Sequence, residues 1–152
     1  PAGVDLPGLP APRFSLSRHL AAEAVRADGT RRPLADVVRE ARQASQPLLA
    51  VAGIARPQAF FDMLAAAGCT PADTLALPDH HDFASGPPLP AGRVLLCTEK
   101  DAVKLWPLHP QAWAVPLEVR VEPAFWQALD AWLDERLPRS APLSSNDGSQ
   151  TA

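Results

Sequence analysis

Two short polar segments combine residue types that could do acid–base chemistry or bind an anion. The first is Asp79-His80-His81-Asp82, here called the DHHD segment, and the second is Thr98-Glu99-Lys100-Asp101, the TEKD segment. Histidine titrates near neutral pH and an adjacent carboxylate can orient its ring, so the DHHD segment suits general acid–base catalysis or metal ligation. Adjacent side chains point in different directions, and no CxxC pair or second ligand group at helical spacing accompanies them, which disfavours a zinc site. A structural or solvated role for these histidines stays open.

The TEKD segment is expected to begin a helix directly after a buried strand. Thr98 can cap this helix, and Asp101 stands three residues further on, in a position similar to that of a capping box. Free backbone N–H groups and the positive end of the helix dipole would then favour an anionic ligand. Lys100 and Lys104 lie four residues apart on one face, where Asp101 can also pair with Lys104. A well-capped helix with a solvated charged face is the alternative interpretation.

The rest of the sequence predicts strands that alternate with helices. Apolar runs indicate strands at 48–54, 74–77, 93–97 and 112–121, with Pro116 marking an edge or a bulge in the last. Apolar residues at helical spacing, bounded by proline and glycine, indicate helices at 34–45, 57–68 and 98–106 and a last helix from Pro123. The predicted fold is therefore α/β, a small, mostly parallel sheet with flanking helices and right-handed crossovers.

Ligands collect beyond the carboxyl ends of parallel strands. Three features fall at that edge in the predicted fold: Gly53-Ile54 with Arg56, the DHHD segment and the TEKD segment. Gly53 is most simply explained by a tight turn from strand to helix, because one glycine is not a dinucleotide fingerprint. The chain contains neither GxxxxGK[ST] nor GxSxG, and so has no P-loop and no hydrolase nucleophile motif of its own.

Composition narrows the class of protein further. The chain has 152 residues, 47% of them hydrophobic, and a net charge of -3, which suits a domain with a real core and argues against a dedicated nucleic-acid binder. No apolar run approaches the roughly 20 residues of a membrane-spanning helix. Two isolated cysteines argue for a reducing cytoplasm. Trp132 is expected to join an apolar stripe on the last helix. All four tryptophans are expected to be core or interface residues: Trp106, Trp113, Trp126 and Trp132.

The 18 prolines cluster at 1–12, 78–90 and 107–123 and mark connections rather than helix interiors. We expect an extended linker at 1–33, in which Asp28-Gly29 favours a hairpin, then an α/β domain at 34–137 and a disordered tail at 138–152. The chain begins with Pro1 and its one methionine is Met63, so we expect a piece of a longer polypeptide or a processed form.

Three blocks of sequence resemble one enzyme family. They are VAGIARPQAFFDMLAAAG at 51–68, LALPDHHDF at 75–83 and LLCTEKDAVKL at 95–105. Their order and spacing are similar to the C-terminal half of tetraacyldisaccharide 4'-kinase, the lipid A kinase of Gram-negative bacteria, over roughly residues 48–137. The resemblance implies a kinase that transfers the γ-phosphate of ATP to the 4'-hydroxyl of a tetraacylated glucosamine disaccharide 1-phosphate. The product would be lipid IVA, made at the cytoplasmic face of the inner membrane.

The resemblance also implies roles for individual residues. The chain would be a smaller, Rossmann-like second domain that closes over the active site of a P-loop kinase. The DH motif of the family matches Asp79 and His80, and the histidine would support a catalytic aspartate across the cleft. The TEKD motif matches Thr98, Glu99, Lys100 and Asp101, which would line that cleft for nucleotide or substrate. ATP and Mg²⁺ would be held mainly by an N-terminal P-loop domain of the same polypeptide, which would also make the membrane contact, and no metal ligand is assigned to these 152 residues.

The sequence departs from the family pattern because it lacks the whole P-loop half. Phosphoryl transfer depends on a phosphate cradle and Mg²⁺, so the 152 residues alone are expected to be inactive. Two other functions stay open from the residues. One is a metal-dependent phosphohydrolase that uses Asp79, His80 and His81, and the other is a non-catalytic α/β binding module.

Overall fold

The computed structural model describes residues 12–137, so the expected tail at 138–152 and the first eleven residues lie outside the described part. Strands and helices alternate over most of this range, as predicted. The elements in chain order are β1 (Leu16–Leu20), β2 (Glu23–Val25), β3 (Arg31–Pro33), α1 (Leu34–Gln43), β4 (Leu48–Ala52), α2 (Pro57–Ala66), β5 (Asp73–Ala76), β6 (Val94–Thr98), α3 (Glu99–Leu105), β7 (Trp113–Val115), β8 (Leu117–Val121) and α4 (Pro123–Arg136). No helix within residues 12–137 is long and apolar enough to cross a membrane.

Six strands form one mixed sheet in the order β3-β2-β7-β6-β4-β5. The four strands β7, β6, β4 and β5 are parallel, and β2 and β3 add an antiparallel hairpin at one edge. Gly29 closes this hairpin with a positive φ of 82°, and Asp28 Oδ1 accepts a hydrogen bond from the Thr30 N–H at 2.9 Å. The predicted α/β class with a mostly parallel sheet is confirmed.

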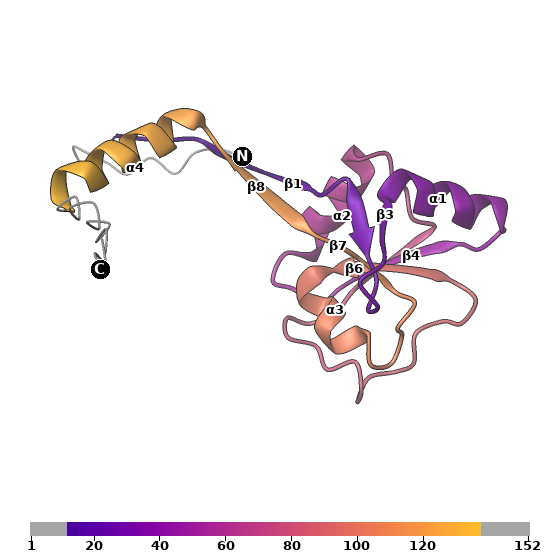
Figure 1. Cartoon of the computed structure of the whole chain (residues 1–152). Helices are drawn as coiled ribbons and strands as arrows, with labels where there is room; N and C mark the ends of the chain where they lie inside the picture. The colour runs from indigo at the N-terminus through magenta and orange to yellow at the C-terminus, as the bar shows by residue number, and fades with distance from the viewer. Residues whose placement is uncertain (1–11, 138–152) are drawn as a thin grey trace, which may run out of the picture. The chain divides into compact units, whose positions relative to one another are not determined.

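Both faces of the sheet are covered, which explains why β4 is apolar at every position. Leu48, Ala50 and Ala52 face the cluster made with α1 and α2, whereas Leu49 and Val51 face the cluster that contains α3. In Figure 1, α1 and α2 lie on one side of the sheet and α3 on the other. All five residues of β4 are buried. A central parallel strand that is covered on both faces has a continuous run of hydrophobic residues in its sequence.

The predicted single strand at 112–121 is wrong, because the structure divides it at Pro116. Residues before the proline form β7 of the six-stranded sheet, whereas residues after it form β8, which pairs with β1 in a separate two-stranded sheet. Pro116 has no N–H to donate to a ladder, and its carbonyl accepts a hydrogen bond from the Ala21 N–H at 2.8 Å. The proline therefore ends one strand and starts another instead of forming a bulge.

The described residues form two compact units, and the division into segments at 1–33 and 34–137 stays a prediction. The larger unit is Ser17–Val119, and the described part of the smaller one is residues 12–16 and 120–137. Strands β2 and β3 belong to the main sheet of the larger unit, because residues 23–33 supply its antiparallel edge. Helix α4 belongs to the smaller unit, where Phe125 packs edge-on against Phe14 with ring centroids 5.4 Å apart.

The tryptophans divide between the two units. Trp113 is buried in the main core and Trp106 is partly buried beside α3. No residue of α4 is buried, and Trp126 and Trp132 are 53% and 51% exposed. These two tryptophans are therefore not core residues in the described part of the chain, and an interface role for them stays a prediction.

Candidate active site at the carboxyl edge of the sheet

The parallel strands bring the DHHD and TEKD segments together at one edge of the sheet. In the register of the sheet Ala52 pairs with Ala76, and Val51 pairs with Cys97. The residues that follow β4, β5 and β6 therefore leave the sheet on the same side. Gly53, the DHHD segment and the TEKD segment are in contact there, and all three belong to the larger unit.

Asp101 is a buried carboxylate at the centre of this group. Its side chain is 3% exposed, and Oδ2 accepts hydrogen bonds from the Gly53 N–H at 3.0 Å and from the Thr98 hydroxyl at 2.6 Å. In return, the Asp101 N–H donates to Thr98 Oγ1 at 3.1 Å, which is the N-cap bond of α3. Asp101 therefore joins the start of α3 to the end of β4. Its carboxylate and the Thr98 hydroxyl are used inside the protein rather than presented at the surface.

The DHHD segment begins as a tight turn attached to Gly53. The His80 N–H donates to the Gly53 carbonyl at 3.2 Å and to Asp79 Oδ1 at 3.0 Å, and the His81 N–H donates to the Pro78 carbonyl at 3.1 Å. His80 takes a left-handed backbone conformation with a φ of 61°, which is uncommon for a residue other than glycine. The side chain of His80 is 72% exposed, so the turn presents its imidazole to solvent.

Helix α3 supplies two lysines to this turn. Lys100 Nζ donates to Asp79 Oδ1 at 3.0 Å, and this bond holds the pKa of the Asp79 carboxyl below its ordinary value. His80 Nε2 lies 3.8 Å from Asp79 Oδ2. Lys104 Nζ donates to the carbonyls of His80 and His81, at 3.1 and 3.4 Å. No sequence pattern places Lys104 at this turn, apart from its position one helical turn after Lys100.

The second half of the DHHD segment serves its own loop. His81 packs edge-on against Phe83 with ring centroids 5.1 Å apart, and a Cβ on Gly86 would come within 2.7 Å of His81 Nε2. Asp82 accepts hydrogen bonds from the Ala84 N–H and the Ser85 hydroxyl, and the Ala84 bond is the main cause of a lowered Asp82 pKa. The DHHD segment therefore combines an exposed pair, Asp79 and His80, with a structural pair.

The geometry gives no support to metal ligation by this segment. Within residues 12–137, no three His, Cys, Asp or Glu side chains are placed to hold one metal ion.

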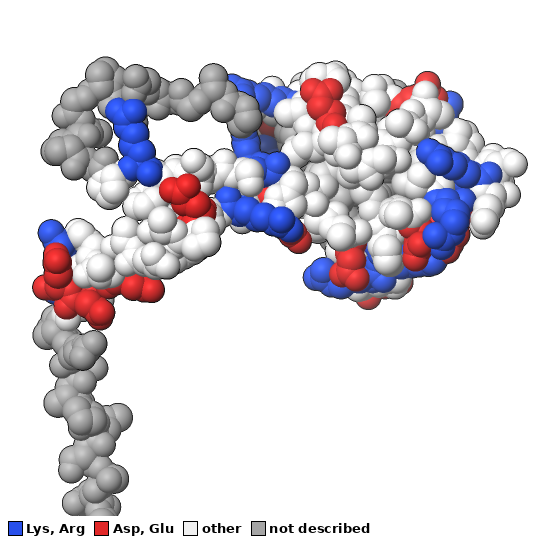
Figure 2. All heavy atoms as spheres, turned by 90° about the horizontal axis from the view of Figure 1, so that it is seen from above, with Lys and Arg blue, Asp and Glu red and all other residues white. Residues whose placement is uncertain are grey.

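Glu99, the remaining member of the TEKD segment, is exposed at the first position of α3. On the face seen in Figure 2, basic and acidic side chains are interspersed over the larger unit.

The fold and the site define an α/β domain with an exposed histidine and a charged carboxylate beyond the carboxyl ends of parallel strands, where such sheets bind ligands. Comparison with known proteins identifies the family. The family model described as tetraacyldisaccharide-1-P 4'-kinase, LpxK, matches residues 10–134, and the chain belongs to this family. The resemblance seen in the three sequence blocks is thereby confirmed.

Named relatives agree with this assignment. The chain is 51% identical to the tetraacyldisaccharide 4'-kinase of Verminephrobacter eiseniae, over 94% of this chain and 33% of that protein. It is 52% identical to that of Acidovorax sp. (strain JS42), over 96% of this chain and 42% of the relative. A crystal structure of Aquifex aeolicus LpxK in complex with ATP has the same fold, with a TM-score of 0.59 and 22% identity, over 82% of this chain and 37% of that one. The chain thus spans about a third to two-fifths of the length of these relatives.

Proposed function

We propose that this chain is the part of a tetraacyldisaccharide 4'-kinase that brings His80 and Asp79 to the site of phosphoryl transfer. The donor would be ATP, the acceptor would be the 4'-hydroxyl of a tetraacylated disaccharide 1-phosphate, and the product would be lipid IVA at the cytoplasmic face of the inner membrane. Membership of the family supports this activity, and the names of the relatives support the substrate.

One observation carries the roles of the two residues. The imidazole of His80 is 72% exposed, yet it stands on a turn whose backbone N–H and C=O groups are both hydrogen-bonded within the protein. A side chain that is free to meet a ligand while its backbone is held fixed is well suited to acid–base work. In this proposal His80 accepts a proton from the acceptor hydroxyl or holds a carboxylate that does so, and Asp79 orients the ring.

The chain would act together with other parts of its parent polypeptide. Phosphoryl transfer needs a cradle for the phosphates and a cation that offsets their charge. The sequence contains no GxxxxGK[ST], and residues 12–137 offer no group of three metal-binding side chains, so we assign the ATP phosphates and Mg²⁺ to a P-loop domain elsewhere in that polypeptide. The 152 residues alone would therefore not phosphorylate the disaccharide.

The test is steady-state kinetics of the complete parent enzyme carrying His80→Ala. We expect kcat to fall by about 10² to 10⁴, the range typical of a lost general acid or base. The KM for ATP should stay within about twofold, because the substitution removes no interaction that binds ATP before the reaction. A His109→Gln variant, which changes a histidine outside the DHHD segment, is the matched control. An unchanged kcat in a folded His80→Ala enzyme would remove the role proposed for His80.

A further inference from the structure

We infer that Lys104 is a positioning residue for His80, and that it acts by holding the carbonyl side of the left-handed turn. This inference rests on the proposed function of His80 for its kinetic consequences. It concerns a residue outside the matched DH and TEKD motifs.

The contacts of Lys104 are with backbone rather than with open space. Its Nζ donates to two successive carbonyls, those of His80 and His81, at 3.1 and 3.4 Å. Carbonyl oxygens are strong acceptors and a lysine ammonium has three donors, so one side chain can bond to both carbonyls. Lys104 therefore bridges from α3 to the turn that carries the exposed imidazole.

Helix α3 also holds the opposite side of the same turn. The His80 N–H donates to the Gly53 carbonyl, and the Gly53 N–H donates to the buried carboxylate of Asp101. The two sides of His80 are thus tied to one helix, the N–H through Gly53 and Asp101 and the C=O through Lys104. A left-handed conformation is disfavoured for a residue with a Cβ, and it persists where surrounding contacts fix it.

The same contacts argue against a direct role in ligand binding. Lys100 and Lys104 are the two lysines of the chain. Lys100 is paired with Asp79, and Lys104 is bonded to the two carbonyls, so both ammonium groups are engaged by the DHHD segment. Losing the Lys104 contacts should move the His80 ring without removing any group that touches substrate. A displacement of about 1 Å in a reacting group can cost as much as about 100-fold in rate.

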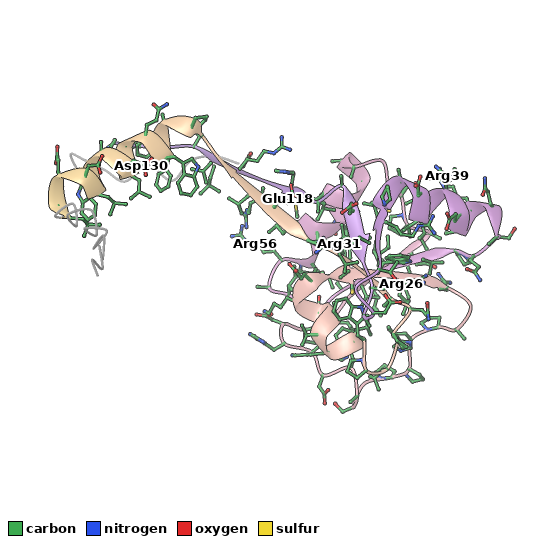
Figure 3. All side chains as sticks on the ribbon, in the orientation of Figure 1. Arg26, Arg31, Arg39, Arg56, Glu118 and Asp130 are labelled. Carbon is green, nitrogen blue, oxygen red and sulfur yellow. The ribbon has the colours of Figure 1, made fainter. Side chains whose placement is uncertain are left out.

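The test uses the complete parent enzyme with Lys104→Met, which keeps the length of the side chain but cannot donate a hydrogen bond. We expect kcat to fall by about 10- to 100-fold while the KM of each substrate stays within about twofold. Lys104→Arg, which keeps the donors, should recover most of kcat. Arg39→Met removes a positive charge from the exposed face of α1 (Figure 3) and should leave kcat unchanged. An increase in KM at constant kcat would overturn the inference, because it would mark Lys104 as a ligand contact.

A double-mutant cycle and hydrogen exchange separate this inference from the proposed function. If Lys104 acts through His80, Lys104→Met should cost little further activity in an enzyme that already carries His80→Ala. A full additional loss in that background would overturn the inference. Amide exchange of the peptide that contains residues 79–84 should be faster in Lys104→Met than in Arg39→Met. If His80→Ala leaves kcat intact but exchange is faster in Lys104→Met, the proposed function fails and the positioning role stands. Unchanged exchange in Lys104→Met overturns the positioning role itself.

Discussion

The carboxylate of Asp101 and the backbone N–H of Gly53 are joined by a buried 3.0 Å hydrogen bond that links residues 48 positions apart. Carboxylates are seldom fully buried unless they are paired or hydrogen-bonded. Here Oδ2 also accepts from the Thr98 hydroxyl, and Asp101 is the one charged residue that is buried within residues 12–137. The bond connects the N-terminus of α3 to the turn after β4, and the His80 turn is attached to the same glycine.

Replacing Asp101 by alanine should destabilise the fold. The substitution leaves the Gly53 N–H without its acceptor and removes hydrogen bonds to a charged group, which are worth roughly 1.5–3 kcal/mol. We therefore expect the free energy of unfolding, measured by urea denaturation, to fall by about that amount. Glu99→Ala changes an exposed acidic residue of the same helix and should cost less than about 1 kcal/mol. Equal losses in the two variants would show that the buried bond contributes no special stability.

Alanine at Gly53 should also be costly, for a steric reason. A Cβ there would lie 3.1 Å from Asp101 Oδ1, 3.2 Å from His81 Cβ and 3.4 Å from the Pro78 carbonyl oxygen, and all three residues take part in hydrogen bonds around Gly53. Overpacking of this kind typically costs about 1–3 kcal/mol. Circular dichroism melting can be compared with Gly68→Ala, where a Cβ meets open space and the strain comes from a φ of 77° alone. A Gly53→Ala protein as stable as the native chain would mean that the turn yields easily.

The pair formed by Lys100 and Asp79 should show a defined pH dependence. The bond from Lys100 lowers the pKa of Asp79, so its contribution to stability is present at neutral pH, above the ordinary pKa. That contribution is lost as the pH falls through the lowered pKa and Asp79 becomes protonated. Carboxyl NMR titration should show the Asp79 pKa rising in Lys100→Met. The stability difference between the two proteins should disappear in strong acid, and a constant difference at every pH would contradict this account.

The two cysteines should be inert while the protein is folded. Burial raises the pKa of the Cys69 thiol to about 11, with Arg42 opposing the shift, and burial followed by the nearby Asp101 charge raises the pKa of Cys97. Both side chains are fully buried. Because the thiolate is the reactive form, a disulfide reagent at about pH 8 should react with neither thiol in native protein and with both in urea. A thiol that reacts at once in native protein would show that its site opens readily.

Local chemistry was predictable from the sequence, whereas contacts between distant segments were not. Thr98 caps α3 and accepts from the Asp101 N–H as its position indicated, because a cap depends on neighbours three residues away. The buried bond from Asp101 to Gly53 depends on how β4 and β6 lie side by side, which no local pattern specifies. Helical spacing puts Lys104 on the same face as Lys100, but its carbonyl partners lie in another segment, which spacing does not indicate.

The DHHD segment shows the same limit. Four consecutive polar residues gave no means of deciding which would face solvent and which would serve the loop. The structure separates them: the imidazole of His80 is exposed on a left-handed turn, whereas the ring of His81 packs against Phe83. The division at Pro116 cannot be read from the sequence. Proline has no N–H to donate, so it suits an edge strand and a junction between two sheets equally well.

The outermost strands of the six-stranded sheet limit edge-to-edge aggregation. A free strand edge exposes unpaired N–H and C=O groups that another chain can join, and natural proteins guard such edges with charge, proline and short length. Strand β3 is three residues long and consists of Arg31 (Figure 3), Arg32 and Pro33. At the other edge β5 has four residues and begins at Asp73, which pairs with Arg93. Neither edge gives an incoming strand a long, uncharged ladder, so folded copies of this chain have little opportunity to associate through this sheet.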